Sequence, residues 1–170
     1  SGLTSTTDTS TIDTSTTSNS TADTSTTDTS TPEGPVDYDV FLLAGDEQCD
    51  NVVASNRTST VEGTPAEALA VLLAGPTAEE TSQGWWSSFT PETAGMLTSV
   101  LIEDGVARIA FDPALPTTIP NASASCGSAA LLAQLDATLT QFDGIERAVY
   151  SLDGDVDAFY LWLQLDPPED

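Results

Sequence analysis

The chain has 170 residues and carries 27 acidic side chains against three arginines, with no lysine and no histidine. Without lysine and histidine, a Ser-His-Asp triad, an imidazole metal ligand, a Schiff-base lysine and a P-loop are all excluded. The formal charge of −24 also repels nucleic-acid phosphates and anionic membrane surfaces. The composition therefore argues against the common catalytic classes and against nucleic-acid binding.

The first 35 residues differ in composition from the rest of the chain. Of residues 1–31, 22 are Ser or Thr, and the string Asp-Thr-Ser-Thr begins at Asp8, Asp13, Asp23 and Asp28. These repeats lack the apolar residue that a shared core would need, so the segment cannot offset the entropy of ordering. We predict a disordered linker over residues 1–35, read as a tether or, alternatively, as an inert tail. A single domain over residues 36–170 follows.

The domain is expected to begin with two strands. Residues Val36–Leu43 alternate apolar and polar side chains and then become fully apolar, which is typical of a strand that runs into the core. After a turn, Asn51–Val61 predicts a returning strand.

A helix with a strong start signal comes next. Thr64 can cap it, Pro65 suits the first helical position, and Glu67 is placed to close a capping box. Gly75-Pro76 ends this helix, and Thr77–Glu80 indicates a second, shorter one. Trp85 and Trp86 are expected in the loop that follows.

The second half of the domain is expected to contain two strand pairs around another helix. Asp-Gly turns at residues 104–105 and 153–154 indicate hairpins. Leu131, Leu135, Leu139 and Phe142 form one stripe of a helix. The predicted elements are the strands Leu97–Glu103 and Val106–Phe111, the loop Asp112–Ser125, the helix Ser128–Phe142, and the strands Ile145–Leu152 and Val156–Leu165.

This order, ββ-α-ββ-α-ββ, predicts an α+β fold. Two helices would pack on one face of a mainly antiparallel sheet that is built from strand pairs. In the last predicted strand, Tyr160 and Trp162 share the outer face.

The two cysteines, Cys49 and Cys126, are far apart and have no histidine near them, which disfavours zinc. In an exported protein they would form one disulfide, whereas in a cytosolic protein they would be two unrelated buried thiols.

Four strings, in order along the domain, carry a family resemblance. They are Thr64–Thr77, which ends in Leu-Leu-Ala-Gly-Pro-Thr, the hairpin Ser99–Asp112, the helix exit Thr138–Ile145 with Gln134 before it, and the hairpin turn Ser151–Gly154. Together they resemble the GerMN domain of bacterial envelope and sporulation proteins, over about Val36–Leu165. The pair Trp85-Trp86 departs from the family, which more often has a single aliphatic residue there.

The resemblance implies a small module without catalytic residues and without a cofactor. Several members of the family are lipoproteins, and related folds build rings in sporulation secretion complexes. We therefore expect a non-catalytic, envelope-anchored extracellular interaction module of a bacterial lipoprotein, linked to cell-wall or to sporulation and germination assemblies. Its partner would be another envelope protein or a cell-wall component. The alternative is a secreted domain that binds a small ligand or Ca²⁺.

The linker and the resemblance together suggest where the domain works. A Ser/Thr-rich coil of about 35 residues has a reach of roughly 30 Å, which gives an anchored domain clearance from a membrane surface. We expect a lipidated cysteine directly before Ser1 in the precursor. The domain would then lie on the extracellular side of the bacterial cytoplasmic membrane, either lipid-anchored or secreted.

Two groups of side chains are candidate binding residues. Trp85, Trp86 and Phe89 form one aromatic cluster, which would stack on a sugar or a protein partner or, alternatively, cover the end of the core. Tyr160 and Trp162 form a second cluster, which would bind a partner or, alternatively, pack under the N-terminal segment or on a neighbouring strand.

Asp153, Asp155 and Asp157 stand where a calcium loop has its first, third and fifth ligands. However, Ala158 and Gln164 replace the glycine and the final glutamate of that loop, so the EF-hand pattern fails. The run is a weak Ca²⁺ site or a solvated acidic turn.

Overall fold

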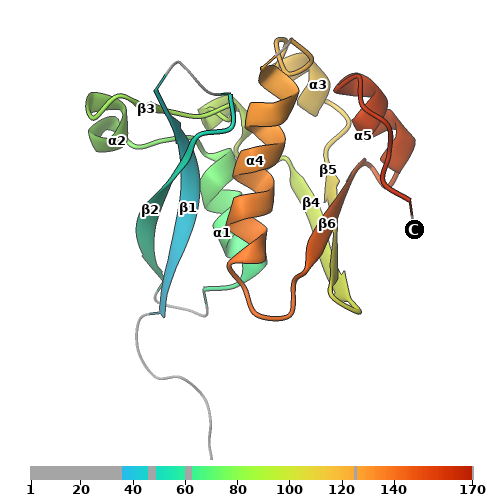
Figure 1. Cartoon of the computed structure of the whole chain (residues 1–170), viewed down its shortest axis with the longest axis horizontal. Coiled ribbons are helices and arrows are strands. Elements are labelled where there is room, and N and C mark those ends of the chain that lie inside the picture. The colour runs from blue at the N-terminus through green and yellow to red at the C-terminus, as the bar shows by residue number, and fades with distance from the viewer. Residues whose placement is uncertain (1–35, 46–48, 60–62, 125, 170) are drawn as a thin grey trace, which may run out of the picture. The chain divides into compact units, whose positions relative to one another are not determined.

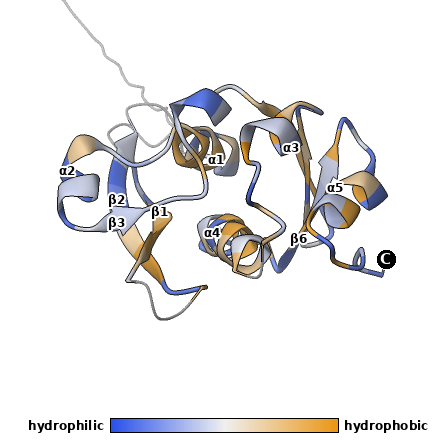
Figure 2. Cartoon of the chain, turned by 90° about the horizontal axis from the view of Figure 1, so that it is seen from above, coloured by the Kyte–Doolittle hydropathy of each residue, from blue (hydrophilic) through white to orange (hydrophobic). Residues whose placement is uncertain are grey.

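The computed structural model of the chain describes residues 36–45, 49–59, 63–124 and 126–169. The predicted linker, residues 1–35, lies outside these residues. Figure 1 shows two sheets with two helices between them, and the view from above in Figure 2 shows the same three layers.

The first sheet has the strand order β2-β1-β3 and is antiparallel. Its strands are β1 (Val36–Ala44), β2 (Val52–Ser59) and β3 (Trp85–Trp86). In β1, Tyr38, Val40 and Leu42 are buried, and this period of two is the alternation seen in the sequence. The tryptophan pair, which was expected in a loop, forms β3 and pairs with Leu43 and Ala44 at the end of β1.

The second sheet has the order β4-β5-β6, with β4 (Leu97–Glu103), β5 (Val106–Phe111) and β6 (Arg147–Leu152). Asp104 and Gly105 both have positive φ, at 50° and 81°, which is the conformation of the predicted two-residue hairpin turn. After β5 the chain crosses over through α4, so β6 lies parallel to β5.

The middle layer consists of α1 (Pro65–Leu73) and α4 (Gly127–Thr140). Both helices contact both sheets. Leu69, Leu72 and Leu73 of α1 and Leu131, Leu135 and Leu139 of α4 are at most 1% exposed, so both predicted apolar stripes form core. The α+β class is thus confirmed, but the helices lie between two sheets instead of on one face of a single sheet.

The start of α1 is as predicted, except for its glutamate. Thr64 Oγ1 accepts a hydrogen bond from the backbone N–H of Glu67 at 3.2 Å. The Glu67 carboxylate does not close the capping box; it accepts from Ser59 Oγ at 2.8 Å and from Tyr38 Oη at 3.5 Å. A carboxylate near the first turn therefore joins the helix to the first sheet.

Polar side chains of α4 and of its C-cap residue, Gln141, cover the part of β1 that β3 leaves without a strand neighbour. Gln141 accepts from the Asp39 N–H at 2.8 Å and donates to its carbonyl at 2.6 Å. Thr138 Oγ1 accepts from the Phe41 N–H at 3.2 Å, and Gln134 donates to the Phe41 carbonyl at 3.0 Å. Two turns of one helix thereby satisfy four backbone groups of a strand, which protects an edge that would otherwise attract other strands.

The prediction of a last strand over Val156–Leu165 is wrong, because residues Val156–Trp162 form the helix α5. Asp155 caps it by accepting from the Ala158 N–H at 2.9 Å. Phe159, Tyr160 and Leu163 are buried, and their spacing is that of one face of a helix. The alternation that suggested a strand included Leu161, but this side chain is 76% exposed. The helix ends with Gln164 at a φ of 60° and with hydrogen bonds from residues 164 and 165 to residues 161 and 160, a Schellman motif without glycine.

Shorter helices complete the domain. They are α2 (Ala78–Ser82), the 3₁₀ turn η2 (Pro91–Thr93) and α3 (Leu115–Thr118). The last of these lies in the segment that was predicted to be a loop. Thr77 and Glu80 form the complete capping box of α2.

Candidate functional site

A cavity of about 550 Å³ opens beside Trp86; we call it the Trp86 cavity. Three segments line it: residues 86–90, residues 118–124, and residues 126–130, which are the N-cap and first turn of α4. Ile119, Ala122 and Ala130 are buried at its floor. Trp86 is 41% exposed, so the indole presents free surface where the cavity meets solvent.

Hydrogen bonds to one buried glutamine hold the 86–90 wall. Gln134, fully buried in α4, accepts from the Ser88 N–H and donates to Ser87 Oγ, both at 2.9 Å. Trp86 is held from the other side, since its Nε1–H donates to the Gly45 carbonyl at 3.4 Å and its backbone pairs with Leu43. The rim of the cavity is therefore fixed by α4 and β1.

The opposite wall depends on Gly127, the first residue of α4. A Cβ at this position would lie 2.2 Å from the Asn121 carbonyl oxygen and 2.8 Å from that of Ala122, so only glycine permits this approach of backbone to backbone. Next to it, Cys126 forms a disulfide with Cys49, with the Cα atoms 5.0 Å apart. The pairing expected from the sequence is thus present, and it ties the wall of the cavity to the turn after β1.

The lining is neutral and chemically unreactive. Its polar members are Ser87, Ser88, Thr90, Thr118 and Asn121, and its one cysteine is in the disulfide. The side chains of Ser88 and Asn121 make no hydrogen bond within the part of the chain that the structure describes. The cavity therefore offers apolar surface and neutral hydrogen-bonding groups, and the described residues that line it include no acid or base for proton transfer.

Trp85, the other half of the pair, faces a second, more polar cavity beside Arg57 and Glu80. Arg57 Nη2 lies 2.7 Å from Glu80 Oε1. Ser55 donates to the same carboxylate, and Thr77 N–H donates to its other oxygen at 2.6 Å. Burial, the largest influence, acts to raise the pKa of Glu80, but these hydrogen bonds and the Arg57 charge outweigh it and hold the pKa below its ordinary value. This network attaches α2 to the edge strand β2.

The remaining aromatic candidates belong to the core. Phe89 is fully buried and Tyr160 is 7% exposed. Trp162 is half-buried and lies edge-on to Phe159, with ring centroids 5.5 Å apart. Of the five aromatic residues predicted to bind a partner, Trp86 is thus the one that stands well exposed, and Phe89 and Tyr160 offer almost no surface.

The acidic turn does not gather into a metal site. Asp153, Asp155 and Asp157 are exposed, and Asp155 uses its carboxylate to cap α5. Among the described residues, no group of three or more His, Cys, Asp or Glu side chains is placed to hold a metal ion.

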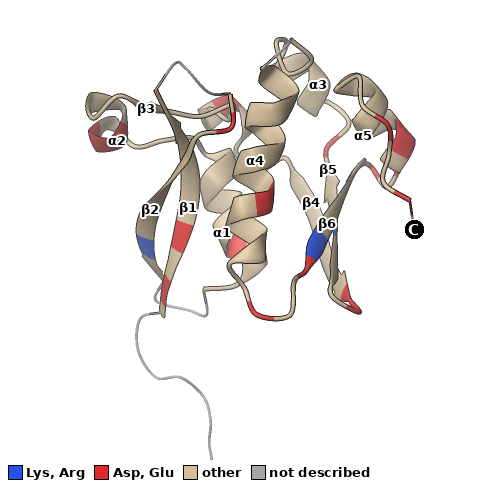
Figure 3. Ribbon diagram, viewed as in Figure 1, with Lys and Arg blue, Asp and Glu red and all other residues tan. Residues whose placement is uncertain are grey.

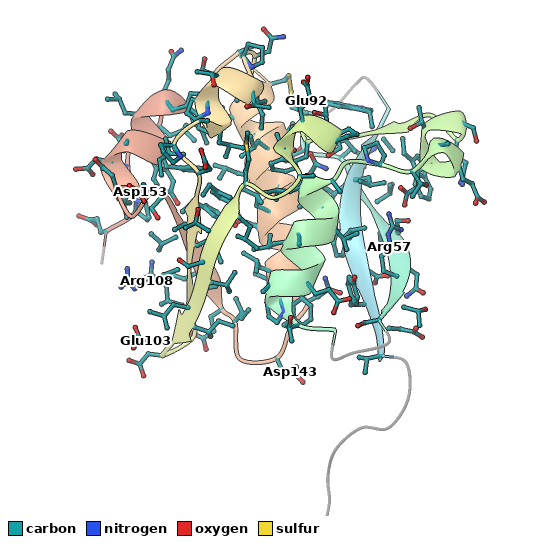
Figure 4. All side chains as sticks on the ribbon, turned by 180° about the vertical axis from the view of Figure 1, so that it is seen from behind. Arg57, Glu92, Glu103, Arg108, Asp143 and Asp153 are labelled. Atoms are coloured by element: carbon teal, nitrogen blue, oxygen red, sulfur yellow. A yellow bond between two sulfur atoms is a disulfide. The ribbon has the colours of Figure 1, made fainter. Side chains whose placement is uncertain are left out.

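Acidic side chains far outnumber cations in the domain. Figure 3 shows acidic positions on helices, strands and turns, with few cations. In Figure 4, Arg57 lies beside the first sheet and Arg108 on the opposite side, by β4 and β5. In residues 36–170, 22 acids face three arginines, since five of the 27 acids precede Pro35. Within the described residues, none of the helices is both long and apolar enough to span a bilayer.

The comparisons with known proteins agree with this fold. The model of the Germane family, described as sporulation and spore germination, matches residues 39–157. The first GerMN domain of the sporulation protein GerM from Bacillus subtilis is 21% identical with a TM-score of 0.51, and the match covers 71% of this chain and 85% of that one. A structure of the tandem GerMN domains of GerM is 18% identical, also with a TM-score of 0.51, over 77% of this chain.

The match covers 43% of that tandem chain, so the present chain spans less than half its length. No protein of curated function matched. At these identities the solved structures show a shared fold, and the family model covers most of the domain. The chain therefore belongs to the Germane family, the family of sporulation and spore germination.

Proposed function

We propose that the chain is a non-catalytic interaction module of the bacterial cell envelope, which binds a cell-wall component or another envelope protein through the Trp86 cavity. The observation that carries this proposal is the cavity itself: an exposed tryptophan beside apolar and neutral polar walls. Exposed tryptophan is enriched at binding surfaces because it combines a large apolar area with little conformational entropy. Walls without titratable side chains suit binding better than proton transfer.

The disulfide supports the location. Cys49 and Cys126 are bonded, and structural disulfides persist in oxidising compartments outside the cytoplasm. The high negative charge keeps such a domain soluble and away from anionic lipid surfaces. The proposal therefore places the domain outside the cytoplasmic membrane and includes the expected lipid anchor. Alkylating thiols in cells before lysis tests the compartment: two reactive thiols would contradict it.

Sedimentation with isolated cell envelopes of the source bacterium tests the binding. The full chain, with its disulfide intact, should sediment with the envelopes, and Trp86→Ala should reduce the bound fraction about tenfold. The matched control is Leu161→Ala, which removes a more exposed apolar side chain from α5, away from the cavity lining. Equal sedimentation of Trp86→Ala and the wild type would refute the proposal.

A further inference from the structure

We infer that the Trp86 cavity binds a neutral sugar ring that carries an N-acetyl group. This inference rests on the proposed function and names the ligand class of the same site. The cavity, at about 550 Å³, falls within the usual range for small-ligand sites, roughly 300–1,000 Å³.

The charge of the lining selects a neutral ligand. Although 18% of the residues of the chain are charged, none of the lining residues is. A cation would find no carboxylate in the cavity to pair with, and an anion would be repelled by the surrounding negative surface. A neutral ligand avoids both the cost of burying an unpaired cation and the repulsion of an anion.

The polar groups favour a sugar over an apolar side chain of a protein partner. Ser88 and Asn121 have no hydrogen-bond partner for their side chains within the described residues. An apolar side chain would bury these groups unpaired, which costs free energy. Sugar hydroxyls would satisfy them, while the apolar face of the ring stacks on the indole of Trp86.

The apolar part of the lining explains the N-acetyl group. Pro120 and Ala124 line the cavity and are exposed, and Ile119 lies next to Pro120 in the same wall. They give an apolar surface that suits a methyl group. The walls are held in place by the Gly127 contact and by the disulfide at Cys126. A site so preorganised loses little entropy on binding a rigid ring.

Saturation-transfer difference NMR on the full chain tests this inference, with triacetylchitotriose as the probe. The strongest transfer should fall on the acetyl methyl protons. Cellotriose, which has hydroxyls in place of the acetamido groups, should bind about tenfold more weakly, and a trigalacturonate, which is anionic, should show no transfer. Trp86→Ala and Asn121→Ala both change exposed residues and should each weaken chitotriose binding about tenfold, whereas Leu161→Ala should leave it unchanged.

Three results would overturn the inference: no transfer to chitotriose, equal binding by both variants and the wild type, or binding of free indole in place of the sugar. The last result would assign the cavity to an apolar side chain of a protein. If envelope sedimentation depends on Trp86 while chitotriose fails to bind, the sugar inference fails and the proposed function stands. If both assays are insensitive to Trp86, both are refuted.

Discussion

Replacing Gln134 by methionine should destabilise the domain by about 3 kcal/mol. The side chain is fully buried and makes three hydrogen bonds, with Ser88 N–H at 2.9 Å, Ser87 Oγ at 2.9 Å and the Phe41 carbonyl at 3.0 Å. Methionine fills a similar volume, so the loss is mainly of these bonds, at about 1 kcal/mol each. The change should also loosen the Ser87–Ser88 wall of the Trp86 cavity.

Gln141, the C-cap residue of the same helix, offers a matched control. It also joins α4 to β1 through hydrogen bonds with Asp39, but it is half-buried, so water can replace its bonds. Gln141→Met should therefore cost about 1 kcal/mol.

Urea denaturation of both variants with the disulfide intact measures the difference. At a slope of roughly 2 kcal/mol per molar, Gln134→Met should lower the midpoint by about 1.5 M and Gln141→Met by about 0.5 M, with slopes unchanged. Equal midpoints for the two variants would refute the argument that the hydrogen bonds of Gln134 are shielded from water.

Three other perturbations test a backbone contact, a buried carboxylate and the net charge of the domain. Gly127→Ala should lower the free energy of unfolding by about 2 kcal/mol, because backbone overlap with Asn121 outweighs the helix propensity of alanine; a denaturation curve at or above that of the wild type would contradict it. The lowered pKa of Glu80 stabilises the fold above the ordinary glutamate pKa of about 4.3, and this stability is lost as the pH falls through the lower folded-state pKa. The stability difference between wild type and Glu80→Gln should therefore shrink below about pH 4, and a difference independent of pH would argue against it. Finally, 22 acids against three arginines in the domain should make the melting temperature rise with NaCl, through screening; a steady fall up to about 0.5 M would refute this.

Local signals in the sequence predicted most of the core elements. Thr64-Pro65 marked the start of α1 and Asp104-Gly105 marked the β4–β5 hairpin, because caps and tight turns depend on a few neighbouring residues. The helix α5 was missed because its local signals are misleading. Its apolar residues alternate as in a strand, and it ends at a glutamine with positive φ instead of a glycine. The signal that could have found it is Asp155 as an N-cap, three residues before Ala158.

Local signals could not predict the arrangement of the sheets or the cavity. The parallel pairing of β6 with β5 and the position of the helices between two sheets depend on contacts between distant segments. The Trp86 cavity is likewise lined by segments up to 44 residues apart, from Trp86 to Ala130. The sequence singled out Trp86, but Ser88, Asn121 and Ala122 carry no pattern that would have joined them to it.

Photo-crosslinking in the source bacterium tests most directly the claim that the domain binds through the Trp86 cavity. A benzoylphenylalanine would be placed in turn at Ala124 in the wall of the cavity, at Leu101 on the edge strand β4, at Leu161 on α5 and at Glu79 on α2, all exposed positions. The account predicts that adducts with envelope material form at position 124 and are weak or absent at the other three. Strong adducts at position 101 or 161, with none at position 124, would contradict it.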